Sequence, residues 1–157
     1  ELTKGEDPGW ESIVGSLEDI GLRPGVRTYI EGAVARGIAL GIVSSNERDW
    51  VLEHLSRLGV ADVWSVVLTA DGDELRAKPH PTLYLDALRS VGAAPDEAVA
   101  VEDSPHGIAA AKSAGLFCVA VPNEVTVNLD LSAADVTVDS LENLPLERLL
   151  ELASGRP

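Results

Sequence analysis

The sequence lacks several features that would mark a disulfide-stabilised, membrane-spanning or secreted protein. Cys118 is its one cysteine, which excludes a disulfide framework within the chain and suits a reducing cytoplasm. The apolar run around Cys118 favours a small buried core residue over a reactive thiol. No apolar run approaches the roughly 18 residues that a membrane span needs, so we expect none. Residues 1–20 have no basic start followed by an apolar block, so we expect no signal peptide there.

Positive charge is also scarce. Twelve Lys and Arg residues stand against 26 Asp and Glu residues, giving a formal net charge of −14. Such a chain repels phosphate backbones and anionic membranes, so we expect no nucleic-acid partner and no membrane partner. A small phosphorylated ligand is not excluded, because a local pocket can differ in sign from the whole surface.

What is present is the composition of a folded globular chain. Apolar residues make up 45% of the 157 residues and charged residues 24%. This length suggests one domain, large enough to bury a core without disulfides or a structural metal.

Apolar spacing predicts that helices and strands alternate along the chain. The first helix follows Asp7-Pro8 and ends at Gly21, and a turn at Leu22 to Gly25 leads into a regular pattern. The predicted helices after that turn cover 26–36, 50–58, 81–91, 105–114 and 144–153, and the predicted strands cover 38–43, 63–68, 98–101, 117–121 and 136–138.

The predicted strands are short, continuously apolar and rich in valine and isoleucine. Strands of this kind are buried on both faces, which predicts an α/β fold with a Rossmann-like, doubly wound parallel sheet. Ligands of such sheets bind beyond the carboxyl ends of the strands. The residues that follow each strand are therefore the candidates for function.

Polar side chains follow the first of these strands and precede the third of these helices. Ser44, Ser45 and Asn46 offer hydroxyl, amide and backbone donors where a helix begins, and such donors can hold an anion. The same tripeptide taken alone is a simple N-cap. Lys78, stiffened by the prolines around it, can reach over the same edge, although a lone lysine is usually a solvated surface charge.

Two adjacent carboxylates, Glu102 and Asp103, follow the third strand. Carboxylates at the end of a buried strand are costly unless something positive compensates them, and Mg²⁺ takes oxygen ligands of this kind. An acidic helix start, with Asp103 or Ser104 as N-cap before Pro105, explains the same residues. Both interpretations can hold together. With the donors and the lysine, these carboxylates are the equipment of phosphoryl transfer.

At these residues the sequence resembles the haloacid dehalogenase-like superfamily, in its β-phosphoglucomutase and metabolite-phosphatase branch. The similarity runs from about residue 22 to residue 145. The residues that carry it are Val43-Ser44-Ser45-Asn46 for the second motif, Lys78-Pro79-His80-Pro81 for the third, Val101 to Ile108 for the fourth, and Leu22 to Val26 for the return linker from a helical cap.

The resemblance implies a role for each site residue. Ser44 would bind the transferring phosphoryl group, with Ser45 and Asn46 beside it. Lys78 would bridge the phosphate and the nucleophile. Glu102 and Asp103 would hold Mg²⁺. The chain would then belong to a Mg²⁺-dependent phosphatase or phosphomutase acting on a small phosphorylated metabolite.

The family's first motif, Asp-x-Asp-Gly, does not precede residue 22. That motif carries the nucleophile and the general acid/base at the end of a central strand. By the resemblance, residues 1–21 are a remnant of the helical cap and residues 22–157 are the core domain, without its central first strand and most of its cap. We therefore expect this chain to be the C-terminal part of a longer enzyme, whose N-terminal segment is cleaved or present as a separate chain. The alternative is a catalytically inactive relative that binds a phosphorylated ligand or a protein partner.

Overall fold

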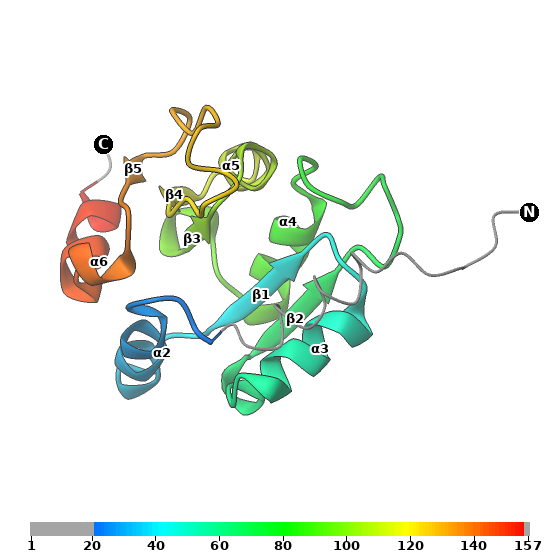
Figure 1. The fold of residues 1–157 in the computed structure, drawn as a ribbon, viewed down its shortest axis with the longest axis horizontal. Coiled ribbons are helices and arrows are strands. Elements are labelled where there is room, and N and C mark those ends of the chain that lie inside the picture. The colour runs from blue at the N-terminus through cyan, green and yellow to red at the C-terminus, as the bar shows by residue number, and fades with distance from the viewer. Residues whose placement is uncertain (1–20, 156–157) are drawn as a thin grey trace, which may run out of the picture.

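The computed structural model describes residues 21–155 of the chain, so nearly all of the expected cap remnant at 1–21 lies outside the described residues. Helices and strands alternate as the sequence predicts (Figure 1). The α-helices are α2 (Val26–Ala35), α3 (Arg48–Arg57), α4 (Thr82–Val91), α5 (Pro105–Ser113) and α6 (Leu146–Ser154). The strands are β1 (Gly41–Ser44), β2 (Val66–Thr69), β3 (Val99–Glu102), β4 (Phe117–Ala120) and β5 (Val136–Thr137), and short 3₁₀ helices cover Ala61–Val63, Pro95–Glu97 and Leu141–Asn143.

All the strand pairs in the described part of the chain are parallel, as the continuous apolar strands predict. β1 pairs with β2, from Gly41 opposite Val66 to Ser44 opposite Thr69. β3 pairs with β4, and β4 pairs with β5, which forms a second sheet of order β3-β4-β5. The α/β fold with parallel sheets is therefore confirmed.

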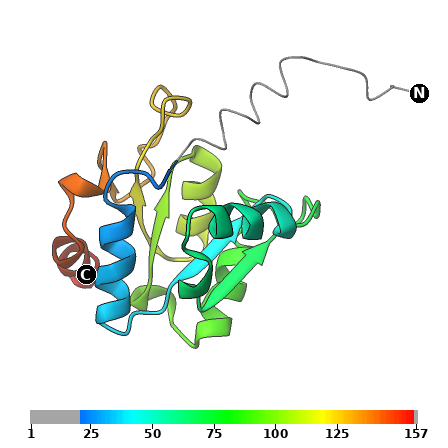
Figure 2. The same cartoon turned by 60° about the horizontal axis from the view of Figure 1, so that its bottom comes forward.

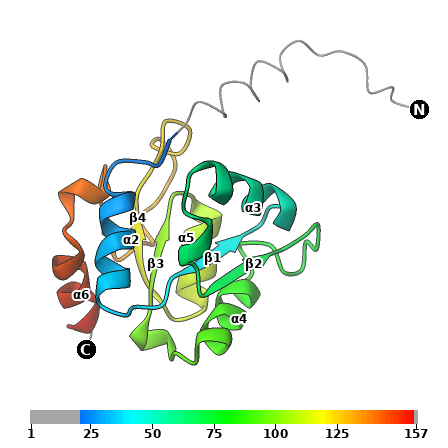
Figure 3. The same cartoon turned by 90° about the horizontal axis from the view of Figure 1, so that it is seen from below.

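Both faces of the sheets are covered by helices. Along β4, Cys118 packs in a cluster with α4 and α5, whereas Phe117 and Val119 pack in a cluster with α6. A third cluster joins α2 and α3 to β1 and β2. The helices α4 and α5 thus cover one face, and α2, α3 and α6 cover the other. Figure 2 shows α2 beside α6, and Figure 3 shows α4 and α3 on either side of β1 and β2.

Within residues 21–155, no strand pairing joins the two sheets to each other. Among the described residues, β1 has only β2 as a ladder partner and β3 has only β4. A cavity of about 110 Å³ lies between the two sheets, lined by Gly41 and Val43 of β1, by Val99 of β3 and by apolar side chains of α4. Val101, in the middle of β3, is 44% exposed. This is where the resemblance places the absent central strand, so the described part of the fold is a partial one.

Two predicted strands begin too early. The strand predicted at 38–43 is observed as β1, Gly41–Ser44, because the amide of Ile38 bonds back to the carbonyl of Ala33 at 2.9 Å and closes α2. The strand predicted at 63–68 is observed as β2, Val66–Thr69, and the residues before it form a 3₁₀ turn. Apolar content alone does not separate a helix end or a tight turn from a strand.

Candidate active site

Three segments that are far apart in the sequence meet at the carboxyl edge of the strands. The backbone amide of Lys78 donates to Oγ of Ser45 at 3.0 Å. The ammonium of the same lysine lies 2.5 Å from Oε1 of Glu102 and forms an ion pair with it. Lys78 therefore connects the segment that follows β1 to the segment that follows β3, and the expected convergence of these residues is observed.

The Glu102 carboxylate is buried and held on several sides. Its Oε1 accepts hydrogen bonds from the ammonium of Lys78 and from the hydroxyl of Tyr84. Burial, and after it the nearby Glu102 charge, raises the pKa of Tyr84, so the phenol stays protonated and donates. The other oxygen, Oε2, lies against Gly107, where an added Cβ would come within 1.8 Å of it. Glu102 is 7% exposed. Its buried charge therefore needs the ammonium of Lys78 as a partner, and its side chain needs the space that Gly107 leaves.

The donors that follow β1 are partly used within the protein. Oγ of Ser44 accepts from the amide of Asn46 at 3.1 Å, and Oδ1 of Asp71 accepts from the amide of Arg48 at 2.6 Å. A hydrogen bond from Thr69, and after it the Arg48 amide, holds the pKa of Asp71 below its usual value. These two amides are therefore engaged. Among residues 21–155, the hydroxyl hydrogens of Ser44 and Ser45 and the side chain of Asn46 have no hydrogen-bond acceptor.

Asp103 has a partner that the sequence did not suggest. Its Oδ2 accepts a hydrogen bond from Nδ2 of Asn123, which follows β4, at 2.8 Å. The next residue, Ser104, is the N-cap of α5 and accepts from the amide of Gly107 at 3.2 Å. The helix-cap interpretation of this segment is thus correct for Ser104, and Asp103 is left to another role.

The two adjacent carboxylates have the chemistry of part of a magnesium site. Glu102 receives both of its hydrogen bonds at Oε1, and Asp103 receives its one at Oδ2. Oδ1 of Asp103 thus receives no hydrogen bond from residues 21–155, whereas Oε2 of Glu102 lies against Gly107. Mg²⁺ is commonly bound by one or two carboxylates together with substrate phosphate and water. Within residues 21–155, no group of three or more Asp, Glu, His or Cys side chains could hold a metal. The pair fits Mg²⁺ as a partial ligand set.

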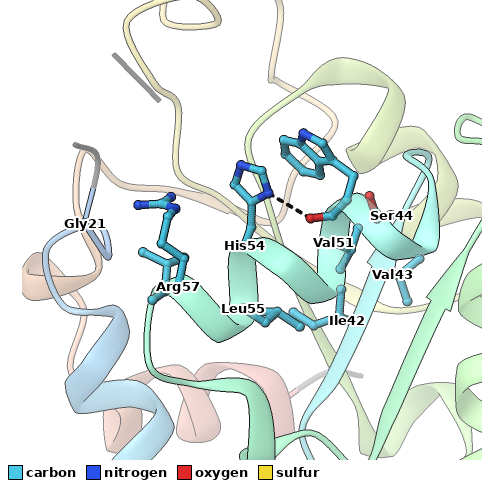
Figure 4. A pocket seen from close by; sticks show the side chains of 10 residues that line it. Gly21, Ile42, Val43, Ser44, Val51, His54, Leu55 and Arg57 are labelled. Atoms are coloured by element: carbon cyan, nitrogen blue, oxygen red, sulfur yellow. Dashed lines mark hydrogen bonds between the residues drawn. The ribbon is translucent and has the colours of Figure 1, made fainter. Parts of the chain in front are cut away.

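A second, larger hollow lies beside Ser44, on the face of β1 that α3 covers (Figure 4). Its volume is about 410 Å³, and mostly apolar side chains line it, including Ile42 of β1 and Leu55 of α3. Trp50 and His54 stack at its edge with their ring centroids 3.9 Å apart. Because α3 and α4 cover opposite faces, this hollow and the cavity between the sheets lie on opposite sides of β1.

The whole-chain comparisons identify the family. The family model described as haloacid dehalogenase-like hydrolase matches residues 10–121, which is well over half of the chain. The chain belongs to this family. YhcW of Bacillus subtilis is 40% identical over 141 residues, covering 90% of this chain and 64% of that protein. CbbY of Rhodobacter capsulatus is 35% identical, covering 97% and 67%, and hexitol phosphatase B of Escherichia coli is 31% identical, covering 82% and 58%.

Solved structures of haloacid dehalogenase-like proteins share the fold. CbbY of Rhodobacter sphaeroides, solved in complex with phosphate, matches with a TM-score of 0.78 and 34% identity, covering 88% of this chain and 64% of that one. A β-phosphoglucomutase of Clostridium difficile matches with a TM-score of 0.75 and 25% identity, covering 91% and 62%. The resemblance to this phosphatase and phosphomutase branch is confirmed. The chain spans about two thirds or less of the length of these relatives.

Sequence reasoning missed the residues that hold the two carboxylates. Tyr84 falls inside the predicted helix 81–91, and Gly107 falls inside the fourth motif, and neither placement by itself signals a contact with Glu102. A glycine one turn into a helix, close behind a buried acid, could have suggested a close contact. Asn123 lies 20 positions from Asp103, and its one local signal is the Asn-x-x-Thr spacing of a turn that ends at Thr126.

Proposed function

We propose that this chain is the C-terminal part of a Mg²⁺-dependent phosphatase or phosphomutase that acts on a small phosphorylated metabolite. In this proposal residues 22–157 form the core domain and residues 1–21 end a helical cap. The observation that carries it is the chain of contacts from Ser45 through Lys78 to Glu102 at the carboxyl edge of the strands. This edge gathers a hydroxyl, a cation and carboxylates, as phosphoryl transfer requires.

The unpaired edges of β1 and β3 support a longer parent protein. An unpaired strand edge presents free N–H and C=O groups that can pair with another strand. Within residues 21–155, β1 and β3 each have such an edge on the side where they face one another. A parallel apolar strand placed between them would complete both ladders. It would also end at the rim near Lys78, where a nucleophilic aspartate would stand. The relatives are single chains longer than this one, so they give no support to the expectation of a separate N-terminal chain.

Each site residue has a defined task in this proposal. Ser44 and Asn46 donate hydrogen bonds to the transferring phosphoryl group, with Ser45 beside them and bonded to the amide of Lys78. Glu102 holds the ammonium of Lys78 at the rim, where its charge offsets the charge on the phosphoryl oxygens.

Glu102 and Asp103 complete the set as the residues that would hold Mg²⁺. When bound there, Mg²⁺ would neutralise phosphate charge and help to orient the phosphoryl group.

The substrate class follows from the family branch and the composition. The relative hexitol phosphatase B is named for a phosphorylated sugar alcohol, and a CbbY structure holds phosphate. The formal net charge of −14 disfavours a nucleic-acid substrate. The described helices include none that is long and apolar enough to cross a bilayer. We place the parent enzyme in the cytoplasm, which suits the single, buried cysteine of this chain.

Substitutions of Lys78 test this proposal in the gene product that includes the residues preceding Glu1. Lys78→Ala should abolish most Mg²⁺-dependent phosphate release from sugar phosphates, whereas Lys78→Arg should retain more of it, because charge is the main requirement. Ala also leaves Glu102 buried without its cation, so the unfolding midpoint of each variant is measured in parallel. Wild-type protein without phosphate release from any ester would favour the inactive, ligand-binding alternative. Equal losses in folded Ala and Arg variants would show that geometry decides.

A further inference from the structure

The loop that follows β4 reaches across to the carboxylate that follows β3. β3 and β4 are parallel neighbours, so their carboxyl ends lie side by side. Nδ2 of Asn123 donates to Oδ2 of Asp103 at 2.8 Å. Among residues 21–155, the Asp103 side chain makes no other hydrogen bond, so its Oδ1 has no hydrogen-bonding partner there.

The orientation of the Asn123 amide is fixed by its own loop. Its Oδ1 accepts from the backbone amides of Val125 at 2.8 Å and Thr126 at 3.0 Å. Its backbone amide in turn donates to Oγ1 of Thr126, which is 8% exposed. Main-chain N–H groups can only donate, so the side-chain oxygen Oδ1 of Asn123 must face them. The side-chain NH₂ group is then the part that faces Asp103. The assignment of nitrogen and oxygen at Asn123 is therefore determined by the network.

The base of the loop is fixed as well. The guanidinium of Arg23 donates to the carbonyl of Val121 at 2.8 Å and to the carbonyl of Pro122 at 2.5 Å. Asn123 is thus held from the residues before it and from the turn after it, independently of Asp103. A side chain held in this way can impose an orientation on a carboxylate that it contacts.

We propose that Asn123 is a positioning residue, which holds Oδ2 of Asp103 so that Oδ1 is presented to the divalent cation. This inference rests on the metal role of Asp103 in the proposed function. Hydrogen-bonding partners of metal-binding side chains typically change metal affinity by about 10-fold to 100-fold when they are replaced.

Asn123→Asp is the variant that isolates this role. It keeps an oxygen to accept from Val125 and Thr126, but it replaces the NH₂ donor by a second carboxylate oxygen facing Asp103. Asn128→Asp is the matched control, since it makes the same chemical change at an exposed residue of the same loop. Asn123→Ser is a second variant, uncharged and too short to reach Asp103 while still able to support a turn.

The experiment is a Mg²⁺ titration by calorimetry of the gene product that includes the residues preceding Glu1, with Mn²⁺ binding by electron paramagnetic resonance as a second readout. We expect both Asn123 variants to weaken Mg²⁺ binding about 10-fold to 100-fold. Asn128→Asp should bind as the wild type does, and all variants should keep the wild-type unfolding midpoint within a few degrees.

The outcomes separate this inference from the proposed function. Binding that is lost in Asp103→Asn but kept in both Asn123 variants would overturn the role of Asn123 alone. A wild-type protein that binds no Mg²⁺, or an Asp103→Asn variant that binds it as well as the wild type does, would overturn the metal role of Asp103 and this inference with it. Equal weakening in Asn128→Asp would show a general charge effect and would also overturn the inference.

Discussion

Replacing Gly107 by alanine should destabilise the fold, although alanine is the better helix former. A Cβ at this position would lie 1.8 Å from Oε2 and 2.3 Å from Cδ of Glu102. Nonbonded heavy atoms settle at about 3.5–4.0 Å, so helix α5 and the carboxylate must separate by roughly 1.5–2 Å. The carboxylate is 7% exposed and bonded to Lys78 and Tyr84, and the clash therefore cannot be relieved by a side chain swinging into solvent.

The magnitude follows from the two ways in which the protein can respond. Moving α5 is an overpacking response that costs about 1–3 kcal/mol, whereas expelling the carboxylate breaks a buried ion pair and costs about 3–5 kcal/mol. Movement of α5 is the less costly response, and because the overlap is large we expect a cost near the upper end of its range. Alanine returns about 1 kcal/mol of helix propensity. We expect a net loss of about 2 kcal/mol in the free energy of unfolding.

Urea denaturation followed by circular dichroism measures this loss, and Gly32→Ala in α2 is the matched control. A Cβ there meets only the end of the Leu146 side chain at 3.0 Å and the Arg36 guanidinium at 3.4 Å, both of which can move. We expect the control to be neutral or stabilising by up to about 1 kcal/mol. In a Glu102→Ala background the Gly107→Ala loss should vanish. An equal loss in both backgrounds would refute the reasoning, because the clash would then not involve the carboxylate.

Three further predictions concern side chains around the site. Tyr84→Phe should lower the free energy of unfolding by about 1.5–3 kcal/mol in urea melts, because it removes a hydrogen bond to the buried Glu102 charge; an unchanged midpoint would contradict this. Burial, and after it Glu102, raises the pKa of Cys118 to about 12, so a disulfide reagent at pH 8 should label the native thiol at least about 100-fold more slowly than the urea-unfolded one. Equal labelling rates would show that the thiol is accessible. The pKa of Asp71 is held below 3.8, so its contribution to stability is complete above that pH and is lost as the pH falls through the folded value. The difference in melting temperature between wild type and Asp71→Asn should therefore shrink below pH 4, and a constant difference would argue against the ionised cap.

The sequence predicts the order of elements well because each buried strand and amphipathic helix carries a local signal. Cys118 and Val119, for example, lie in one unbroken apolar run, and their side chains are buried on opposite faces of β4. The start of β1 could not be predicted, because it depends on the amide of Ile38 closing the preceding helix. The apolar residues before that point look the same in either arrangement.

The site likewise contains residues that the sequence predicts and partners that it does not. The strand ends predict that Ser45, Lys78 and Glu102 meet, because parallel strands bring their carboxyl ends to one edge. Partners that reach the site from another loop leave little local trace. Asp71 caps a helix that begins 23 positions earlier, and Asn123 bonds to an aspartate 20 positions before it. Such pairs depend on the register of neighbouring strands, which a single sequence does not specify.

Phosphate release by the gene product that includes the residues preceding Glu1, measured over a panel of sugar phosphates with and without Mg²⁺, tests the central claim most directly. We predict release that requires Mg²⁺ and falls at least about 100-fold in Asp103→Asn, with an unchanged unfolding midpoint. Release that is independent of Mg²⁺, or that is unaffected by Asp103→Asn at every Mg²⁺ concentration, would contradict the assignment of this edge of the sheet as a phosphoryl-transfer site.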